Sequence, residues 1–339
     1  MKTPLFAGTL AMTLLGSGLV AAEGTLEQVI ERGHLNCGSH ISRAGFASQD
    51  SNGNWHGFDV GFCRALAAAV LGDPSAVQFE PLTAQSRFDA LTEGEVDVLA
   101  RSTTWTFLRD VEKELTFVGT YYYDGQGFMV KREMGVSSAL ELDETTICIE
   151  TGTTTVLNLD DYFRANGMSY EAVTVESSDD AKQGYQQGDC EVYTSDIAAL
   201  ASGRAGFADP GAHVILPEVI SKEPLGLVVR HGDDAWADIV RWTLFALIAA
   251  EELGITSTNL EELKASSTKP EIRRLLGSEG SFGAVMGLAD DWAARAIAAV
   301  GNYGELFAST IGDQTPIGLA RGLNAQWTQG GLLYAPPFR

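Results

Sequence analysis

The sequence predicts an α/β protein built from two similar lobes, each a mostly parallel sheet flanked by helices. Short β-type runs alternate with amphipathic helical segments, which is typical of strands joined by helical crossovers. The alternation pauses after residue 100 and restarts near residue 145. The length of 339 residues fits about two domains.

The two series of elements follow the same order. In the first series we expect strands at residues 34–38, 76–82 and 95–100 and helices at 57–70, 86–92 and 107–114. Two extended runs, 115–123 and 126–131, surround the turn Asp124-Gly125. In the second series we expect strands at 145–150, 170–175 and 190–194 and helices at 154–166, 179–187 and 196–202.

A later strand at residues 226–230 is expected to return the chain to the first lobe. The chain then crosses between the lobes near Gln126 and again within residues 218–224, which makes a two-strand hinge. The first lobe would hold residues 23–125 and 219–339, and the second lobe residues 126–218. Helical patterns at 235–253 and 290–307 are expected to cover the first lobe. A separate C-terminal interaction module is the alternative, but no Pro/Ser-rich linker precedes it.

The N-terminus has the pattern of a secretory signal peptide. Lys2 precedes an apolar stretch without charge, and the small residues Ala21 and Ala22 close it, so we expect residues 1–22 to be removed before Glu23. A retained anchor helix is the alternative. No cysteine lies near the cut, so a lipid anchor is not expected. No later stretch has the length and apolarity of a membrane span.

The charge of the chain excludes some partners. Without Lys2 it has 22 basic and 45 acidic residues, a net charge of −23 with neutral histidines. Such a surface repels nucleic acid and anionic membranes. The sequence also lacks GxSxG, HExxH, a P-loop and a full GxGxxG, so neither an enzyme nor a cofactor is indicated.

Four cysteines allow three disulfide pairings. Cys37 ends the first strand and Cys63 lies in the helix expected to pack on it, while Cys148 and Cys190 lie in two strands of the second series. We therefore predict Cys37–Cys63 and Cys148–Cys190, since an exported chain can oxidise its thiols. Zinc binding is the alternative, but no CxxC is present and the five histidines are scattered, so no metal is expected.

Polar residues follow the strand at 95–100, where a parallel sheet places its binding crevice. They are Arg101, Ser102, Thr103 and Thr104. Thr106 can cap the next helix, which leaves Arg109 in its first turn, an unfavourable place for a cation in the helix dipole. A ligand carboxylate would explain Arg109, because a guanidinium binds carboxylates through two hydrogen bonds. A surface arginine beside a Thr-rich turn is the alternative.

The second lobe offers complementary groups. The strand ending at Glu150 is followed by Thr151-Gly152-Thr153-Thr154-Thr155, where threonines begin a helix whose N-terminus can take an anion. Asp196 follows the strand at 190–194 and could pair with an ammonium group, although an N-cap role would explain it equally. An arginine and a helix N-terminus for a carboxylate, with an aspartate for an amine, together suit a zwitterion.

The order and spacing of several motifs resemble periplasmic polar amino-acid-binding proteins, which feed ABC importers. The resemblance covers nearly the whole mature chain. The run Ser102-Thr103-Thr104-Trp105-Thr106, the paired cysteines and the closing stretch from Trp327 to Arg339 are similar to the general L-amino-acid branch. The other matching motifs are Leu35-Asn36-Cys37-Gly38, Gly57-Phe58-Asp59-Val60, Arg87-Phe88-Asp89-Ala90-Leu91, Gly152-Thr153-Thr154-Thr155 and Thr194-Ser195-Asp196.

The resemblance implies a type II periplasmic binding protein fold and a periplasmic monomer that delivers L-amino acids to an inner-membrane ABC permease. It assigns the ligand carboxylate to Arg109 and further contacts to Ser102 and Thr104. It assigns the helix start to Thr154, with Thr155 beside it, and the ligand amine to Asp196.

The chain departs from narrow-specificity members at His40, Arg43 and Arg101, which puts a pocket for cationic ligands in doubt. If these side chains contact the ligand directly, they would favour glutamate, aspartate and their amides. If they reach it only through water, the site would accept a broad range of amino acids. Arg101 has an alternative partner in Glu150 of the facing lobe. The alternative functions are an exported enzyme on the same fold, such as a prephenate- or arogenate-type dehydratase, and a sensory or scaffold protein.

Overall fold

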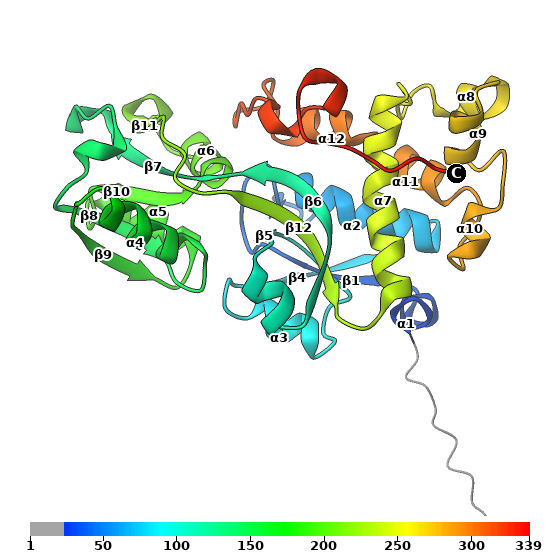
Figure 1. The fold of residues 1–339 in the computed structure, drawn as a ribbon, viewed down its shortest axis with the longest axis horizontal. Helices are drawn as coiled ribbons and strands as arrows, with labels where there is room; N and C mark the ends of the chain where they lie inside the picture. The colour runs from blue at the N-terminus through cyan, green and yellow to red at the C-terminus, as the bar shows by residue number, and fades with distance from the viewer. Residues whose placement is uncertain (1–23) are drawn as a thin grey trace, which may run out of the picture.

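The computed structural model describes residues 24–339, so the expected signal peptide and its cleavage after Ala22 lie outside the described residues. Two five-stranded sheets form two lobes, which lie side by side and are joined by long strands (Figure 1). The first sheet has the order β4-β1-β5-β12-β6, and the second has the order β11-β7-β10-β8-β9. The predicted α/β class and two-lobe architecture are therefore confirmed.

Each sheet is mixed. In the first, β4 (Val77–Pro81), β1 (Leu35–Ser39) and β5 (Val98–Thr104) are parallel, while β12 (Glu223–Arg230) runs antiparallel between β5 and β6 (Leu115–Asp124). The second sheet repeats this plan, with a parallel part and an antiparallel part. Its parallel strands are β9 (Tyr170–Val175), β8 (Thr145–Glu150) and β10 (Val192–Asp196), and its antiparallel strands are β7 (Gln126–Lys131) and β11 (His213–Ile215).

Helices cover both faces of each sheet because neighbouring strand residues point to opposite sides. In the first lobe, α2 (Phe58–Leu71) packs on the face that holds Val98, and α3 (Arg87–Thr92) packs on the face that holds Leu99. In the second lobe, α4 (Thr155–Ala165) covers one face, and α5 (Ser178–Gln187) and α6 (Ile197–Ala205) cover the other. The sequence did not indicate α1 (Thr25–Arg32), β11 or the short strands β2 (Ser48–Gln49) and β3 (Trp55–His56).

The chain passes between the sheets at Gly125, where β6 becomes β7, and returns between β11 and β12. At Gly125 the two crossing segments approach closely. A Cβ atom there would lie 2.2 Å from Cγ1 of Val219 and 2.8 Å from the carbonyl oxygen of Ser221. A side chain would therefore separate the two segments, and glycine allows them to run together through the hinge.

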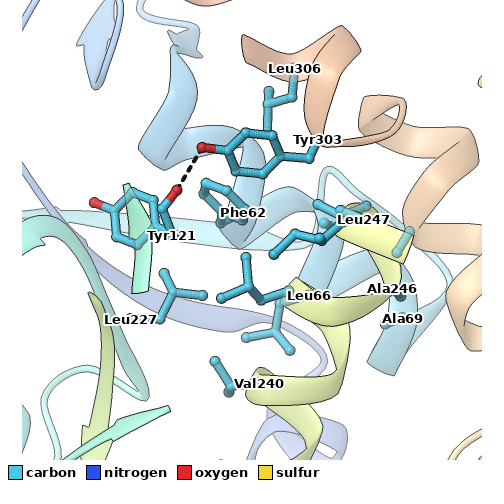
Figure 2. Packing of buried hydrophobic residues seen from close by; sticks show 14 of the residues in the cluster. Phe62, Leu66, Ala69, Tyr121, Leu227, Val240, Ala246, Leu247, Tyr303 and Leu306 are labelled. Carbon is cyan, nitrogen blue, oxygen red and sulfur yellow. Dashed lines mark hydrogen bonds between the residues drawn. The ribbon is translucent and has the colours of Figure 1, made fainter. Parts of the chain in front are cut away.

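The C-terminal region shares the core of the first lobe. Helix α7 (Asp234–Glu252) packs on β6 and β12, and α11 (Trp292–Val300) and α12 (Tyr303–Thr310) pack against α2 and α7. Figure 2 shows Phe62 and Leu66 of α2 among side chains from these helices and from the sheet. The Tyr303 hydroxyl, fully buried, donates to the carbonyl oxygen of Tyr121 at 2.8 Å. The remaining short helices are α8 (Leu260–Ser266), α9 (Pro270–Leu275) and α10 (Phe282–Val285).

Three expected elements differ from the structure. The strand expected at 95–100 is Val98–Thr104, because the antiparallel strand β12 supplies hydrogen-bonding partners for its last residues. The helix expected at 107–114 is only a short π-helical turn, Leu108–Glu112. The helix expected at 290–307 is divided into α11 and α12. Gly301 adopts φ 79°, and Asn302 forms a capping box with Glu305 that starts a new helix.

Both predicted disulfides, Cys37–Cys63 and Cys148–Cys190, are present. They leave no cysteine thiol for the zinc alternative. Each bridge joins elements of one lobe and neither crosses the hinge. Within residues 24–339, no helix combines the length and apolarity that crossing a membrane requires.

Loss of either disulfide is predicted to lower the free energy of unfolding by about 2–4 kcal/mol, because each bridge restricts the unfolded chain. Cys148→Ser/Cys190→Ser and Cys37→Ser/Cys63→Ser should each show this loss in denaturant titrations. A non-reducing peptide map of the purified protein supplies the control. A Cys63–Cys148 peptide, or four free thiols in the exported protein, would contradict the assignment.

Candidate functional site

All nine predicted site residues line one cavity between the lobes. The cavity measures about 30 Å³, room for about two water molecules, so a larger ligand requires the lobes or the lining side chains to move. The nine are His40, Arg43, Arg101, Ser102, Thr104, Arg109, Thr154, Thr155 and Asp196, and the structure adds Arg87, Glu150, Thr153 and Ser195.

The first lobe positions its arginines through backbone carbonyl groups. Nε of Arg101, on β5, donates to the carbonyl oxygen of Leu82 at 2.8 Å. Nη1 of Arg109 donates to the carbonyl oxygen of Thr104 at 2.8 Å, and its guanidinium lies 5.3 Å from the centroid of the Phe88 ring. These contacts occupy only part of each guanidinium, so both arginines retain donors for a ligand.

The cavity concentrates buried positive charge. Arg43, Arg87, Arg101 and Arg109 line it, and each is at most 9% exposed. Between residues 24 and 339, none of these four arginines lies within 4.0 Å of a carboxylate oxygen. Burial lowers the pKa of Arg101 to about 10, although the carboxylate of Glu150 opposes the shift. Buried charges without partners are costly, so an anionic ligand would relieve this arrangement.

Arg101 and Glu150 both line the cavity, but they form no ion pair in this structure. The structure therefore leaves both alternatives for Arg101: direct contact with the ligand, or pairing with Glu150 across the two lobes when they close further.

Arg87 was not among the predicted site residues. Its sequence signal was the Arg87-Phe88-Asp89-Ala90-Leu91 motif, and its buried Nε has no hydrogen-bond partner among the described residues. Burial, followed by the charges of Arg101 and Arg109, lowers the pKa of Arg87.

His40 lines the cavity without adding to its positive charge. Burial, together with the positive charges of Arg43 and Arg101, holds the pKa of His40 well below its usual value. Its buried Nε2 has no hydrogen-bond partner within residues 24–339. The imidazole is therefore neutral and can offer a ligand one hydrogen bond but not a charge.

Ser102 has a strained backbone that a buried network holds in place. Its φ is 43°, in the left-handed region that non-glycine residues seldom adopt. Its N–H donates to the hydroxyl of Tyr121 at 2.9 Å, and its Oγ donates to Asp59 at 3.1 Å. Tyr121 also donates to Asp59, at 2.7 Å. The hydroxyl proton of Ser102 is thus directed to Asp59 rather than into the cavity.

Asp196 stands at the N-cap position of α6, but its side chain makes no capping hydrogen bond. The carboxylate lines the cavity instead. Burial, followed by the negative charges of Asp124 and Glu223, raises the pKa of Asp196 well above its usual value. A ligand ammonium group would offset this negative charge. The capping explanation for Asp196, left open by the sequence, does not describe its side chain.

Glu223 holds two cavity-lining threonines, a role that the sequence did not reveal. It is 2% exposed and begins β12, directly behind the cavity. Its carboxylate accepts hydrogen bonds from Thr104 of the first lobe and from Thr154 and Asn158 of the second. No recognisable motif surrounds it, because these partners come from two distant parts of the chain, β5 and the start of α4. The lobes also meet where Nε2 of Gln85 donates to Oγ1 of Thr151 at 2.7 Å.

Comparison with known proteins identifies the family. Residues 35–258 match the family model described as bacterial extracellular solute-binding proteins, family 3. The chain belongs to this family. The matched region contains every element of the second lobe and the cavity-lining residues of both lobes.

Two relatives align with this chain over its full length. It is 58% identical over 339 residues to the glutamate/glutamine/aspartate/asparagine-binding protein BztA of Rhodobacter capsulatus, with 100% of both chains covered. It is 50% identical over 342 residues to the general L-amino acid-binding periplasmic protein AapJ of Rhizobium johnstonii, again with 100% of both covered. The suspected relationship to the general L-amino-acid branch is confirmed.

A solved structure, the ABC transporter periplasmic binding protein from Brucella ovis with glutathione bound, matches with a TM-score of 0.91. It is 52% identical, and the match covers 94% of this chain and 100% of that one. The type II periplasmic binding protein fold expected from the sequence is therefore confirmed.

Asp124, at the hinge, is predicted to make stability depend on pH. Burial raises its pKa from 3.8 to about 7, although N–H groups of Gly125 and Ala198 oppose the shift. Because the folded-state pKa exceeds the unfolded one, its contribution to stability is complete below about pH 4 and is lost as pH rises through about 7.

One such carboxyl changes the free energy of unfolding by up to about 1.4 kcal/mol per pH unit. Urea titrations at several values between pH 4 and 8 should therefore give a shallower decline for Asp124→Asn than for the unsubstituted protein. Parallel declines would show that Asp124 titrates normally.

Proposed function

We propose that this protein captures L-amino acids between its lobes and delivers them to an inner-membrane ABC permease from the periplasm, as a monomer. One observation carries the proposal: Arg109 of the first lobe and Asp196 of the second line the same cavity, and the carboxylate of Asp196 makes no helix-capping hydrogen bond. A zwitterion supplies the opposite charge for each. The ligand carboxylate would bind Arg109 through two hydrogen bonds, and the ligand ammonium group would bind Asp196.

Closure of the lobes completes the proposed site. We propose that residues 23–125 and 219–339 move as one lobe against residues 126–218, since contacts come from both sides of the hinge. Closure excludes water and strengthens the charged contacts. The backbone N–H groups of Thr154 and Thr155, at the N-terminus of α4, would add donors and the positive end of a helix dipole for the ligand carboxylate.

The ligand side chain is proposed to favour acids and their amides. Arg43, Arg87 and Arg101 line the cavity without carboxylate partners within 4.0 Å in the described part of the chain, and a second carboxylate would gain charge-assisted hydrogen bonds from them. A lysine or arginine ligand would meet like charge. Two relatives support ligands that carry more than one carboxylate or amide group. One is named for binding glutamate, glutamine, aspartate and asparagine, and the other is described with glutathione bound.

No observation favours the dehydratase alternative, and the relatives are named as binding proteins. The proposal is tested by denaturing purified protein and analysing the released small molecules by mass spectrometry. An unmodified L-amino acid, present at close to one equivalent, is the expected result. Recovery of a converted product from an added prephenate-like acid would instead favour the enzyme.

Arg109→Ala and Asp196→Ala are predicted to weaken every amino-acid ligand by a similar amount. Each substitution leaves an opposite charge of the ligand buried and unpaired, which costs about 2–5 kcal/mol. Calorimetry with glutamate, asparagine and alanine measures the loss. The matched control is Arg132→Ala. Arg132 lies outside the cavity, and its Nε donates to the carbonyl oxygen of Gly211. Retained affinity in either cavity variant would mean that the shared groups bind elsewhere.

Arg101→Ala is predicted to weaken glutamate and aspartate more than leucine and alanine, by about 1.5–3 kcal/mol for a charged hydrogen bond. Titration of all four ligands distinguishes direct contact from lobe clamping. If Arg101 acts by pairing with Glu150 in a more closed state, all four ligands should weaken equally, and Glu150→Gln should produce the same change. That outcome would favour a broad-specificity binder.

A further inference from the structure

We propose that Glu223 is a positioning residue that fixes the hydroxyl groups of Thr104 and Thr154 as hydrogen-bond acceptors toward the ligand, and thereby selects ligands that carry an ammonium group. The inference rests on the proposed function, since it concerns how the same cavity recognises the amine. Glu223 itself does not line the cavity, whereas both threonines do.

The carboxylate of Glu223 accepts hydrogen bonds from four side chains. Its Oε2 accepts from Oγ1 of Thr104 at 2.6 Å and from Oγ1 of Thr154 at 2.9 Å. Its Oε1 accepts from Nδ2 of Asn158 at 2.7 Å and from Oγ of Ser221 at 2.6 Å. An ionised carboxylate only accepts and has about four lone-pair sites, so these four donors saturate it.

A threonine hydroxyl has one proton and two lone pairs. Because Thr104 and Thr154 each direct that proton to Glu223, only lone pairs remain for the cavity. Neither hydroxyl can then donate to a ligand carboxylate. Both can accept from an ammonium group, which has three N–H donors and no acceptor.

The cavity is thereby divided into two chemically opposite parts. Thr104, Thr154 and the carboxylate of Asp196 present acceptors, while the arginines present donors. Thr104 belongs to the first lobe and Thr154 to the second, so the acceptor set is complete only when both lobes meet Glu223. A dicarboxylate without an amine would leave these acceptors unpaired, and such unpaired buried groups discriminate strongly between ligands.

Glu223→Gln tests this role. In the orientation that keeps its oxygen on Nδ2 of Asn158 and Oγ of Ser221, the new side chain places its amide nitrogen beside the threonines. The nitrogen donates, and the threonine protons turn into the cavity. Affinity for L-glutamate should fall at least tenfold, while affinity for glutarate, which has the same two carboxylates and no amine, should not fall. Glu218→Gln, whose hinge carboxylate accepts from Ser138 and Ala139, is the matched control and should leave both affinities unchanged.

A double-mutant cycle separates action through the hydroxyls from the simple loss of a negative charge. In the Thr104→Val/Thr154→Val background, Glu223→Gln should weaken L-glutamate less than twofold further, because the groups it acts through are gone. This cycle uses L-glutamate alone, so it remains decisive if glutarate binds too weakly to titrate. A further tenfold loss in that background would overturn the proposal.

The remaining outcomes are also distinct. Equal losses for L-glutamate and glutarate in Glu223→Gln would mean that Glu223 only maintains the fold, which overturns this inference and leaves the proposed function intact. Failure of the unsubstituted protein to bind any L-amino acid would overturn both. If Glu223→Gln shows no cooperative melting transition, Thr104→Val and Thr154→Val are titrated singly. Each should weaken L-glutamate and spare glutarate, and equal losses would contradict the proposal.

Discussion

The antiparallel pairing of β12 between β5 and β6 is the constraint on which the rest of the structure depends. It extends β5 to Thr104, since Thr103 and Thr104 pair with Gly226 and Leu225. The strand begins where the second crossing of the hinge ends, and it sets Glu223 opposite Asp124 at the end of β6. One strand therefore joins the lobes, carries the buried carboxylate behind the cavity and positions the residues in front of it.

The cavity is where this chain departs from the ordinary rules of protein interiors. Elsewhere its interior is dominated by apolar clusters, whereas here four arginines are buried without a carboxylate within 4.0 Å in residues 24–339. Ser102 adds a positive φ, and His40 adds an unpartnered nitrogen. Local violations of this kind are typical of functional sites, because a ligand can relieve what folding alone leaves unfavourable. The apolar clusters on both faces of each sheet supply the stability that tolerates them.

Much of the candidate site could be predicted from the sequence because its signals are local. Arg109, Thr154 and Asp196 follow strands or begin helices, and their spacing from those elements is readable in one chain. Glu223 could not be found in this way, since its role depends on Thr104, Thr154 and Asn158, which are between 65 and 119 residues away. The end of β5 at Thr104 was missed for the same reason: its partner strand lies more than a hundred residues later. Long-range pairing, rather than local pattern, decided both.

The insertion of β12 also sets an order of assembly. The strands of the second sheet lie within residues 126–215, one uninterrupted stretch that includes Cys148 and Cys190, so this lobe can form and oxidise by itself. The first sheet cannot, because β5 and β6 have no strand between them until residues 223–230 have been made. Exposed strand edges promote aggregation. The lobe that begins the chain is therefore completed last, and until then its open sheet is the part of the folding chain most exposed to aggregation.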